Sequence, residues 1–168
     1  ILISSERNQL LPTIHSRVTE YVFHPLSDSD LVSILQKSGF DGQTCDSIIP
    51  VAGGSVSYAL TLARNDLYSQ LKEAYSAIAS FVCQPEVFSY DLSPILQEIG
   101  AYRTIDLLIN IFRLHCTKNV VPWLHSALDR THAIEIIKIL LELRKGISHN
   151  INIRMALKGM LYSLCFTK

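Results

Sequence analysis

The chain has 168 residues, of which 48% are apolar and 18% are charged, so it can bury a substantial core and is not a disordered segment. Its 15 basic and 15 acidic residues cancel, which excludes an overall basic field as the means of binding nucleic acid. The sequence has no apolar run of the roughly 18 residues that a membrane helix needs. We therefore expect a cytoplasmic protein that does not enter a membrane.

The first 24 residues are expected to form short strands around one helical turn. Residues 1–3 are an apolar run typical of a strand, which needs neighbouring strands to satisfy its backbone groups. Residues 10–17 suit a short helical turn entered through Pro12, and residues 21–23 are apolar and β-prone. Because the chain opens in mid-strand and without an initiator Met, we expect it to be part of a longer protein.

Three short helices are predicted between residues 25 and 65. Ser27 is a favourable N-cap for the first helix, and Gly39 ends it. The second helix covers residues 44–51 and is interrupted late by a proline. The third begins after a pair of glycines, with Ser55 as its cap. Three helices of this length predict a compact helical unit.

Longer helices are predicted beyond residue 66, and this change marks a domain boundary. They cover residues 67–83, 92–99, 104–116, 131–145 and 152–166. Apolar residues recur at helical spacing in two of them, at Ile105, Leu108, Ile109 and Phe112 and at Ile134, Ile137 and Leu141. Further apolar residues widen the second stripe, at Ile136, Ile139, Leu140 and Leu143. That helix is therefore either central in its bundle or also faces a partner subunit.

The most informative motif is Leu-Leu-Pro-Thr-Ile-His-Ser-Arg at residues 10–17. It resembles the LLPTIRSRC signature of AAA+ clamp-loader subunits, with His15 in place of an arginine and Val18 in place of the cysteine. In that family the last arginine acts in trans on ATP bound by a neighbouring subunit. The resemblance implies that Arg17, preceded by Ser16, is such an arginine finger, because a planar guanidinium can bridge phosphate oxygens. Taken without the family, Arg17 is a surface arginine in an ordinary turn.

A second motif, Gly-Ser-Val-Ser-Tyr-Ala-Leu at residues 54–60, looks like the lid-domain motif GSxRxAL of the same family. Its arginine senses nucleotide in cis, whereas Ser57 stands at that position here and cannot supply a cation to a phosphate. The resemblance implies a degenerate sensor, as in subunits of the delta-prime type, while ATP-hydrolysing relatives keep the arginine. Ser4 or Ser5 falls where the family places the polar sensor-1 residue. Taken without the family, the second motif is only a helix cap.

The resemblance implies a mainly α chain in three parts. Residues 1–24 would be the C-terminal remnant of an AAA+ ATPase core, with the sensor-1 strand and the arginine-finger segment. Residues 25–65 would be a three-helix lid, and residues 66–168 a helical collar domain that mediates oligomerisation. The motifs cover residues 1–65, and beyond them the likeness lies only in length, helix content and helix order.

The function implied by the resemblance is that of a non-catalytic stator in the bacterial DNA polymerase III clamp loader, which uses ATP to load the sliding clamp onto primed DNA. The implied partners are the gamma/tau and delta subunits, bound through the collar, with the clamp and DNA bound by the assembled complex. The chain would hold no cofactor and would be no enzyme by itself, but part of a nucleotidyltransferase holoenzyme.

Two alternatives stay open. One is an ATP-hydrolysing clamp-loader subunit of the gamma/tau or replication factor C type, and the other is a helical DNA-binding or adaptor module, whose DNA-binding version the zero net charge disfavours. The histidines and cysteines lack zinc-ligand spacing, and the sequence contains no nucleophile elbow and no glycine-rich phosphate loop. The four cysteines lie far apart and are expected to be buried free thiols.

Overall fold

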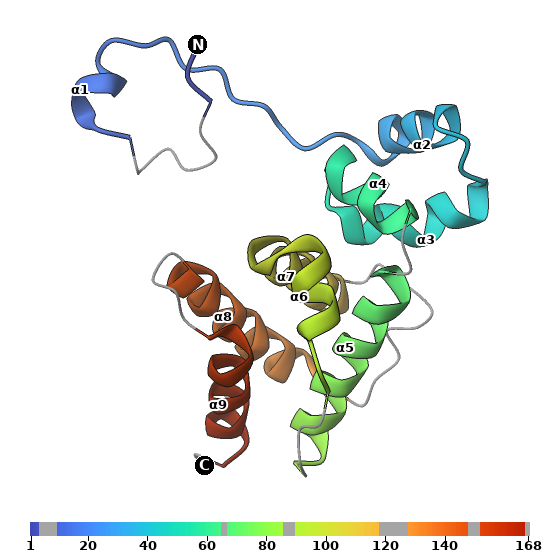
Figure 1. Ribbon diagram of the computed structural model, residues 1–168, viewed down its shortest axis with the longest axis vertical. Coiled ribbons are helices and arrows are strands. Elements are labelled where there is room, and N and C mark those ends of the chain that lie inside the picture. The colour runs from blue at the N-terminus through green and yellow to red at the C-terminus, as the bar shows by residue number, and fades with distance from the viewer. Residues whose placement is uncertain (4–9, 65–66, 86–89, 118–127, 148–151, 167–168) are drawn as a thin grey trace.

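The protein is mainly helical, as the sequence predicts. The computed structural model describes residues 1–3, 10–64, 67–85, 90–117, 128–147 and 152–166, and within them no strand is present. The helices are α1 (Pro12–His15), α2 (Asp28–Lys37), α3 (Gly42–Ala52), α4 (Val56–Arg64), α5 (Leu67–Cys83), α6 (Ser93–Ile99), α7 (Ala101–Cys116), α8 (Arg130–Gly146) and α9 (Ile153–Phe166). Figure 1 shows α1 apart from the other helices, α2–α4 grouped together, and α5–α9 in a second group.

The strands expected at residues 1–3 and 21–23 are not formed. Both segments are described, and neither has regular secondary structure. Their apolar side chains are exposed, including those of Ile3 and Phe23. A strand is stable only where neighbouring strands take up its backbone N–H and C=O groups, and no described residue offers such a partner. The expected core strand is therefore not formed in the described residues, and the assignment of residues 1–24 to an AAA+ remnant remains a prediction.

The ends of α2 and α3 are determined by local capping. Ser27 Oγ accepts a hydrogen bond from the backbone N–H of Asp30 at 3.2 Å, which confirms the predicted N-cap of α2. Asp41 accepts from the N–H of Thr44 at 2.6 Å, so α3 starts two residues earlier than predicted. This hydrogen bond also lowers the pKa of the Asp41 carboxyl. At the other end, α3 continues past Pro50 and stops at Gly53, which adopts the left-handed conformation with φ 58°.

Helix α7 is central in the larger helical group. It packs against α3, α5, α6 and α8, and its predicted apolar stripe is buried, as Phe112 shows with no exposed surface. The ring of Phe112 lies 4.9 Å from that of Tyr75 on α5. Tyr75 in turn bonds His115 Nδ1 at 2.9 Å, and His115 Nε2 lies 2.9 Å from the carbonyl oxygen of Leu128. Because a carbonyl only accepts, Nε2 carries the proton, and His115 joins α5 and α7 to the start of α8.

The buried face of α8 is not the first apolar stripe that the sequence indicates, at Ile134, Ile137 and Leu141. It consists of residues one position earlier in the chain. The buried residues are Ala133, Ile136, Leu140 and Leu143. Ile134 is instead exposed, and Ile137 and Leu141 are half-buried. One side of α8 therefore faces the core, and the adjoining side carries apolar side chains that are partly exposed. The buried side chains of both helical groups belong to one continuous cluster, and the predicted division at residues 25 and 66 remains a prediction.

Candidate functional site

Arg17 follows directly on the short helix α1. Pro12 occupies the first turn, where its missing N–H costs no hydrogen bond. The turn closes when Ser16 donates its N–H to Pro12 O at 3.1 Å and Arg17 donates its own to Ile14 O at 3.0 Å. Ser16 Oγ also donates to the carbonyl of Thr13 at 3.2 Å. The proline and these three hydrogen bonds hold the Ser16-Arg17 pair at the C-terminal end of the helical turn.

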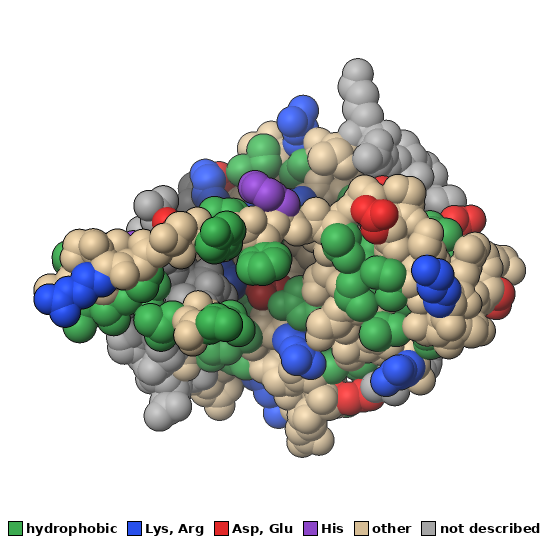
Figure 2. Space-filling model, turned by 90° about the horizontal axis from the view of Figure 1, so that it is seen from above, with side chains coloured by type: hydrophobic (Ala, Val, Ile, Leu, Met, Phe, Trp, Pro, Cys, Tyr) green, Lys and Arg blue, Asp and Glu red, His purple; other side chains and the backbone are tan. Residues whose placement is uncertain are grey.

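The Arg17 side chain is exposed. No ion pair of the described residues involves it. Residues 10–27, which we term the arm, extend away from the helical groups and carry exposed apolar side chains at Leu11, Val18, Tyr21, Val22 and Phe23. Figure 2 shows hydrophobic side chains along this projecting part of the molecule and a Lys or Arg side chain at its tip. The guanidinium of Arg17 is thus available to a group outside the described chain.

Ser57 lies in the first turn of α4, far from α1 (Figure 1). Ser55 Oγ accepts from the N–H of Tyr58 at 3.3 Å and so caps this helix, as predicted. The Ser57 side chain is exposed, while its carbonyl accepts from Thr61 Oγ1 at 2.7 Å. The structure therefore does not bring Arg17 and Ser57 together. Ser4 and Ser5, the sensor-1 candidates, lie outside the described residues.

The arm joins the helices at Gly54. Leu26 donates its N–H to Gly54 O at 3.0 Å. Gly54 has φ +79°, and a Cβ built on it would lie 2.4 Å from Pro25 Cβ and 3.0 Å from Leu26 O. Only a residue without a side chain fits this conformation and this close approach. Gly54, the first residue of the second motif, thus has a packing role. It allows the chain just before α2 to pack against the turn between α3 and α4.

Gly54→Ala is expected to destabilise the protein by about 2–3 kcal/mol, because left-handed strain of about 1 kcal/mol adds to a clash with the backbone of the arm. Gly39→Ala is the matched control. Gly39 has φ +91°, but a Cβ added to it would meet nothing within 4 Å, so it carries the strain without the clash. Urea unfolding followed by circular dichroism measures both variants. Equal losses would mean that the arm does not pack on Gly54.

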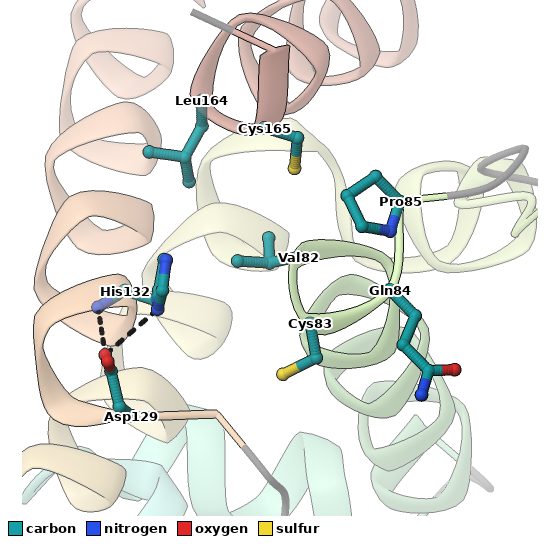
Figure 3. Close-up of a pocket in the computed structure, with 8 residues that line it drawn as sticks. All are labelled: Val82, Cys83, Gln84, Pro85, Asp129, His132, Leu164 and Cys165. Carbon is teal, nitrogen blue, oxygen red and sulfur yellow. Dashed lines mark hydrogen bonds and ion pairs between the residues drawn. The ribbon is translucent and has the colours of Figure 1, made fainter. Parts of the chain in front are cut away.

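A cavity of about 480 Å³ lies at the opposite end of the molecule, where α5 and α9 end and α8 begins. Figure 3 shows Cys83, Cys165 and His132 around it, from three different helices. Asp129 Oδ1 accepts from the N–H of His132 at 2.8 Å and lies 3.0 Å from its Nδ1. The backbone hydrogen bond and the nearby imidazole lower the pKa of Asp129. Asp129 is thus the N-cap of α8, and His132 donates the capping N–H.

The two thiols of the cavity have raised pKa values. Desolvation raises the pKa of both Cys83 and Cys165, so they stay protonated near neutral pH. Within the described ranges, no group of three or more His, Cys, Asp or Glu side chains has the geometry to hold a metal ion. All four cysteines are free, as predicted, but only Cys45 is buried and Cys83 is exposed. The cavity therefore offers a helix cap and two thiols that are protonated near neutral pH.

A polar contact that sequence reasoning missed joins the two helical groups. It involves Tyr58 on α4, Asp106 on α7 and Arg144 on α8. No sequence pattern indicates it, since the three residues lie on separate helices and 48 residues separate the first two.

Comparisons with protein-family models, with curated proteins and with solved structures yield no match. None of the helices in the described ranges is both long and apolar enough to span a membrane.

Proposed function

We propose that this chain serves as a non-catalytic clamp-loader subunit of the delta-prime type, which donates Arg17 to ATP bound by a neighbouring subunit. The observation that carries the proposal is the motif at residues 10–17 together with the exposure of Arg17 at the end of α1. A finger that acts in trans has to reach a neighbouring subunit, and the exposed guanidinium, which forms no ion pair with the described residues, meets that requirement on a projecting arm. The subunit would work in the cytoplasm on the sliding clamp and primed DNA.

Two further features support the proposal. The sensor position in α4 holds Ser57, which has no positive charge to offer a phosphate, so this chain is suited to assist hydrolysis elsewhere more than to read its own nucleotide. The partly exposed apolar side chains of α8, among them Ile134 at 40% exposure, suit a helix that also contacts a neighbouring subunit. The collar role of residues 66–168 rests on this point and on the family resemblance.

Assembly with the cognate gamma/tau and delta subunits tests the proposal. The chain, co-expressed with them, is expected to elute in one complex on size-exclusion chromatography with light scattering, and to be absent from that fraction when gamma/tau is left out. Elution as a separate species in the presence of all partners would contradict the proposed function. The complex is also the material for the measurements on Arg17 below.

Calorimetric titration separates the proposal from its ATP-hydrolysing alternative. The chain alone is expected to take up no ATP at micromolar concentration, because its sequence holds no glycine-rich phosphate loop and its α4 offers a hydroxyl where a nucleotide sensor needs a cation. Micromolar binding would favour the ATP-hydrolysing type.

A further inference from the structure

One carboxylate joins three helices at the junction of the two helical groups. Tyr58 on α4 donates its hydroxyl to Asp106 Oδ2 at 2.9 Å. The other oxygen, Asp106 Oδ1, lies 2.7 Å from Nε of Arg144 on α8. The second contact is an ion pair between the guanidinium and the carboxylate. Asp106 belongs to α7, and its two oxygens therefore hold α4 on one side and α8 on the other.

The contact is partly shielded from solvent. The side chains of Asp106 and Arg144 are 25% and 37% exposed, against 74% and 62% for the surface pair of Lys145 and Glu142. Charged contacts gain strength as water is excluded. Burial, followed by the hydrogen bond to Asp106, raises the pKa of Tyr58 to about 12. Its hydroxyl therefore remains a donor at any ordinary pH.

A second contact lies one turn further along α7. Asn110 Nδ2 donates to the carbonyl oxygen of Val51, near the end of α3, at 3.1 Å. A Cβ on Gly53 would come within 2.7 Å of that nitrogen, so the glycine leaves room for the amide. Asp106 and Asn110 are four residues apart and hence on the same face of the helix. This face of α7 thus bonds both α3 and α4.

We propose that Tyr58, Asp106, Arg144 and Asn110 form a polar lock that fixes the orientation of α2–α4 relative to α5–α9. Apolar packing is non-directional and tolerates sliding, whereas hydrogen bonds at two points on one helix face fix both distance and angle. The arm is seated on α2–α4 through Leu26 and Gly54. The lock therefore fixes the point from which the arm that carries Arg17 leaves the helices relative to α5–α9, and its members are positioning residues. This last consequence rests on the proposed function.

The lock is tested on the isolated chain by the distance between α2 and α9. Labels are placed on exposed residues, Gln36 and Lys158, through an unnatural amino acid, so that the native cysteines stay in place. Pulsed electron paramagnetic resonance is expected to give a narrow distance distribution for the wild type. In Tyr58→Phe the distribution broadens, and in Tyr58→Phe combined with Asn110→Ala it broadens further, with helical circular dichroism unchanged.

Tyr102→Phe is the matched control. Tyr102 is half-exposed and lies on α7, and removal of its hydroxyl is expected to leave the distribution narrow. A distribution as narrow in Tyr58→Phe as in the wild type overturns the lock. This single variant removes one oxygen atom and keeps the ring, so the test stands even if the double variant fails to fold.

The positioning role has its own readout in the assembled loader. Tyr58→Phe is expected to lower ATP hydrolysis without loss of assembly, by no more than Arg17→Ala lowers it, since misplacing a catalytic group by about 1 Å costs up to 10²-fold at the site that depends on it. If Tyr58→Phe broadens the distance distribution but hydrolyses ATP at the wild-type rate, the positioning role is overturned, while the proposal of the lock itself still stands. A lowered rate of ATP hydrolysis in the Arg17→Ala loader in the same assay keeps the proposed function separate from this result.

Discussion

Arg17→Ala is expected to lower the clamp- and DNA-stimulated ATP hydrolysis of a reconstituted loader while the chain still folds and assembles. The guanidinium is exposed, so its removal changes stability by no more than about 0.5 kcal/mol. Arginine fingers in other phosphoryl-transfer systems are worth about 10³ to 10⁵ in rate. A loader with several ATP sites loses only the turnover that depends on this finger, which makes the measured fall smaller than the effect at one site.

Two companion variants sharpen the measurement of Arg17. Arg17→Lys keeps the charge but lacks the planar fork, so it is expected to restore little activity. Arg64→Ala removes another exposed arginine, in the last turn of α4, and is expected to leave hydrolysis unchanged. Wild-type turnover and clamp loading by an assembled Arg17→Ala complex would reduce Arg17 to a surface residue, and the assignment in trans would be abandoned.

Phe112→Ala is expected to cost about 3–5 kcal/mol of the free energy of unfolding. The Phe112 side chain has no exposed surface and its ring meets that of Tyr75 at 4.9 Å. The substitution therefore removes buried apolar area and an aromatic contact. It also leaves a cavity in the core beside α7, the helix that contacts α3, α5, α6 and α8. Such a loss is a large part of the roughly 5–15 kcal/mol that stabilises a typical domain.

Chemical denaturation followed by circular dichroism measures the effect of Phe112→Ala. Phe23→Ala is the matched control, because this phenylalanine on the arm is 95% exposed and its loss is expected to change stability by no more than about 0.5 kcal/mol. Phe112→Leu keeps most of the volume and should cost less than about 1.5 kcal/mol. Similar losses in Phe112→Ala and Phe23→Ala would contradict the central place of α7.

The helices were predictable where their signals are local. The span of α5 agrees with the prediction at both ends, and Ser27 caps α2 as its position in the sequence indicates. The start of α3 was missed because Asp41, the residue that caps it, was not recognised. Residues 1–3 and 21–23 have the composition of strands, but a strand depends on partners far away in the chain, which composition does not reveal.

The two motifs that single out Arg17 and Ser57 are likewise readable in the sequence. So are the helix cap at Ser55 and the glycine turn before it. Only the tertiary structure decides that Arg17 is exposed and distant from α4, that the buried stripe of α8 runs through Ile136 and Leu140, and that Asp106 links Tyr58 to Arg144. The physical reason is the distance along the chain over which each interaction acts. Capping and periodicity act within about one or two turns of a helix, whereas burial and contacts between helices depend on how separate helices pack.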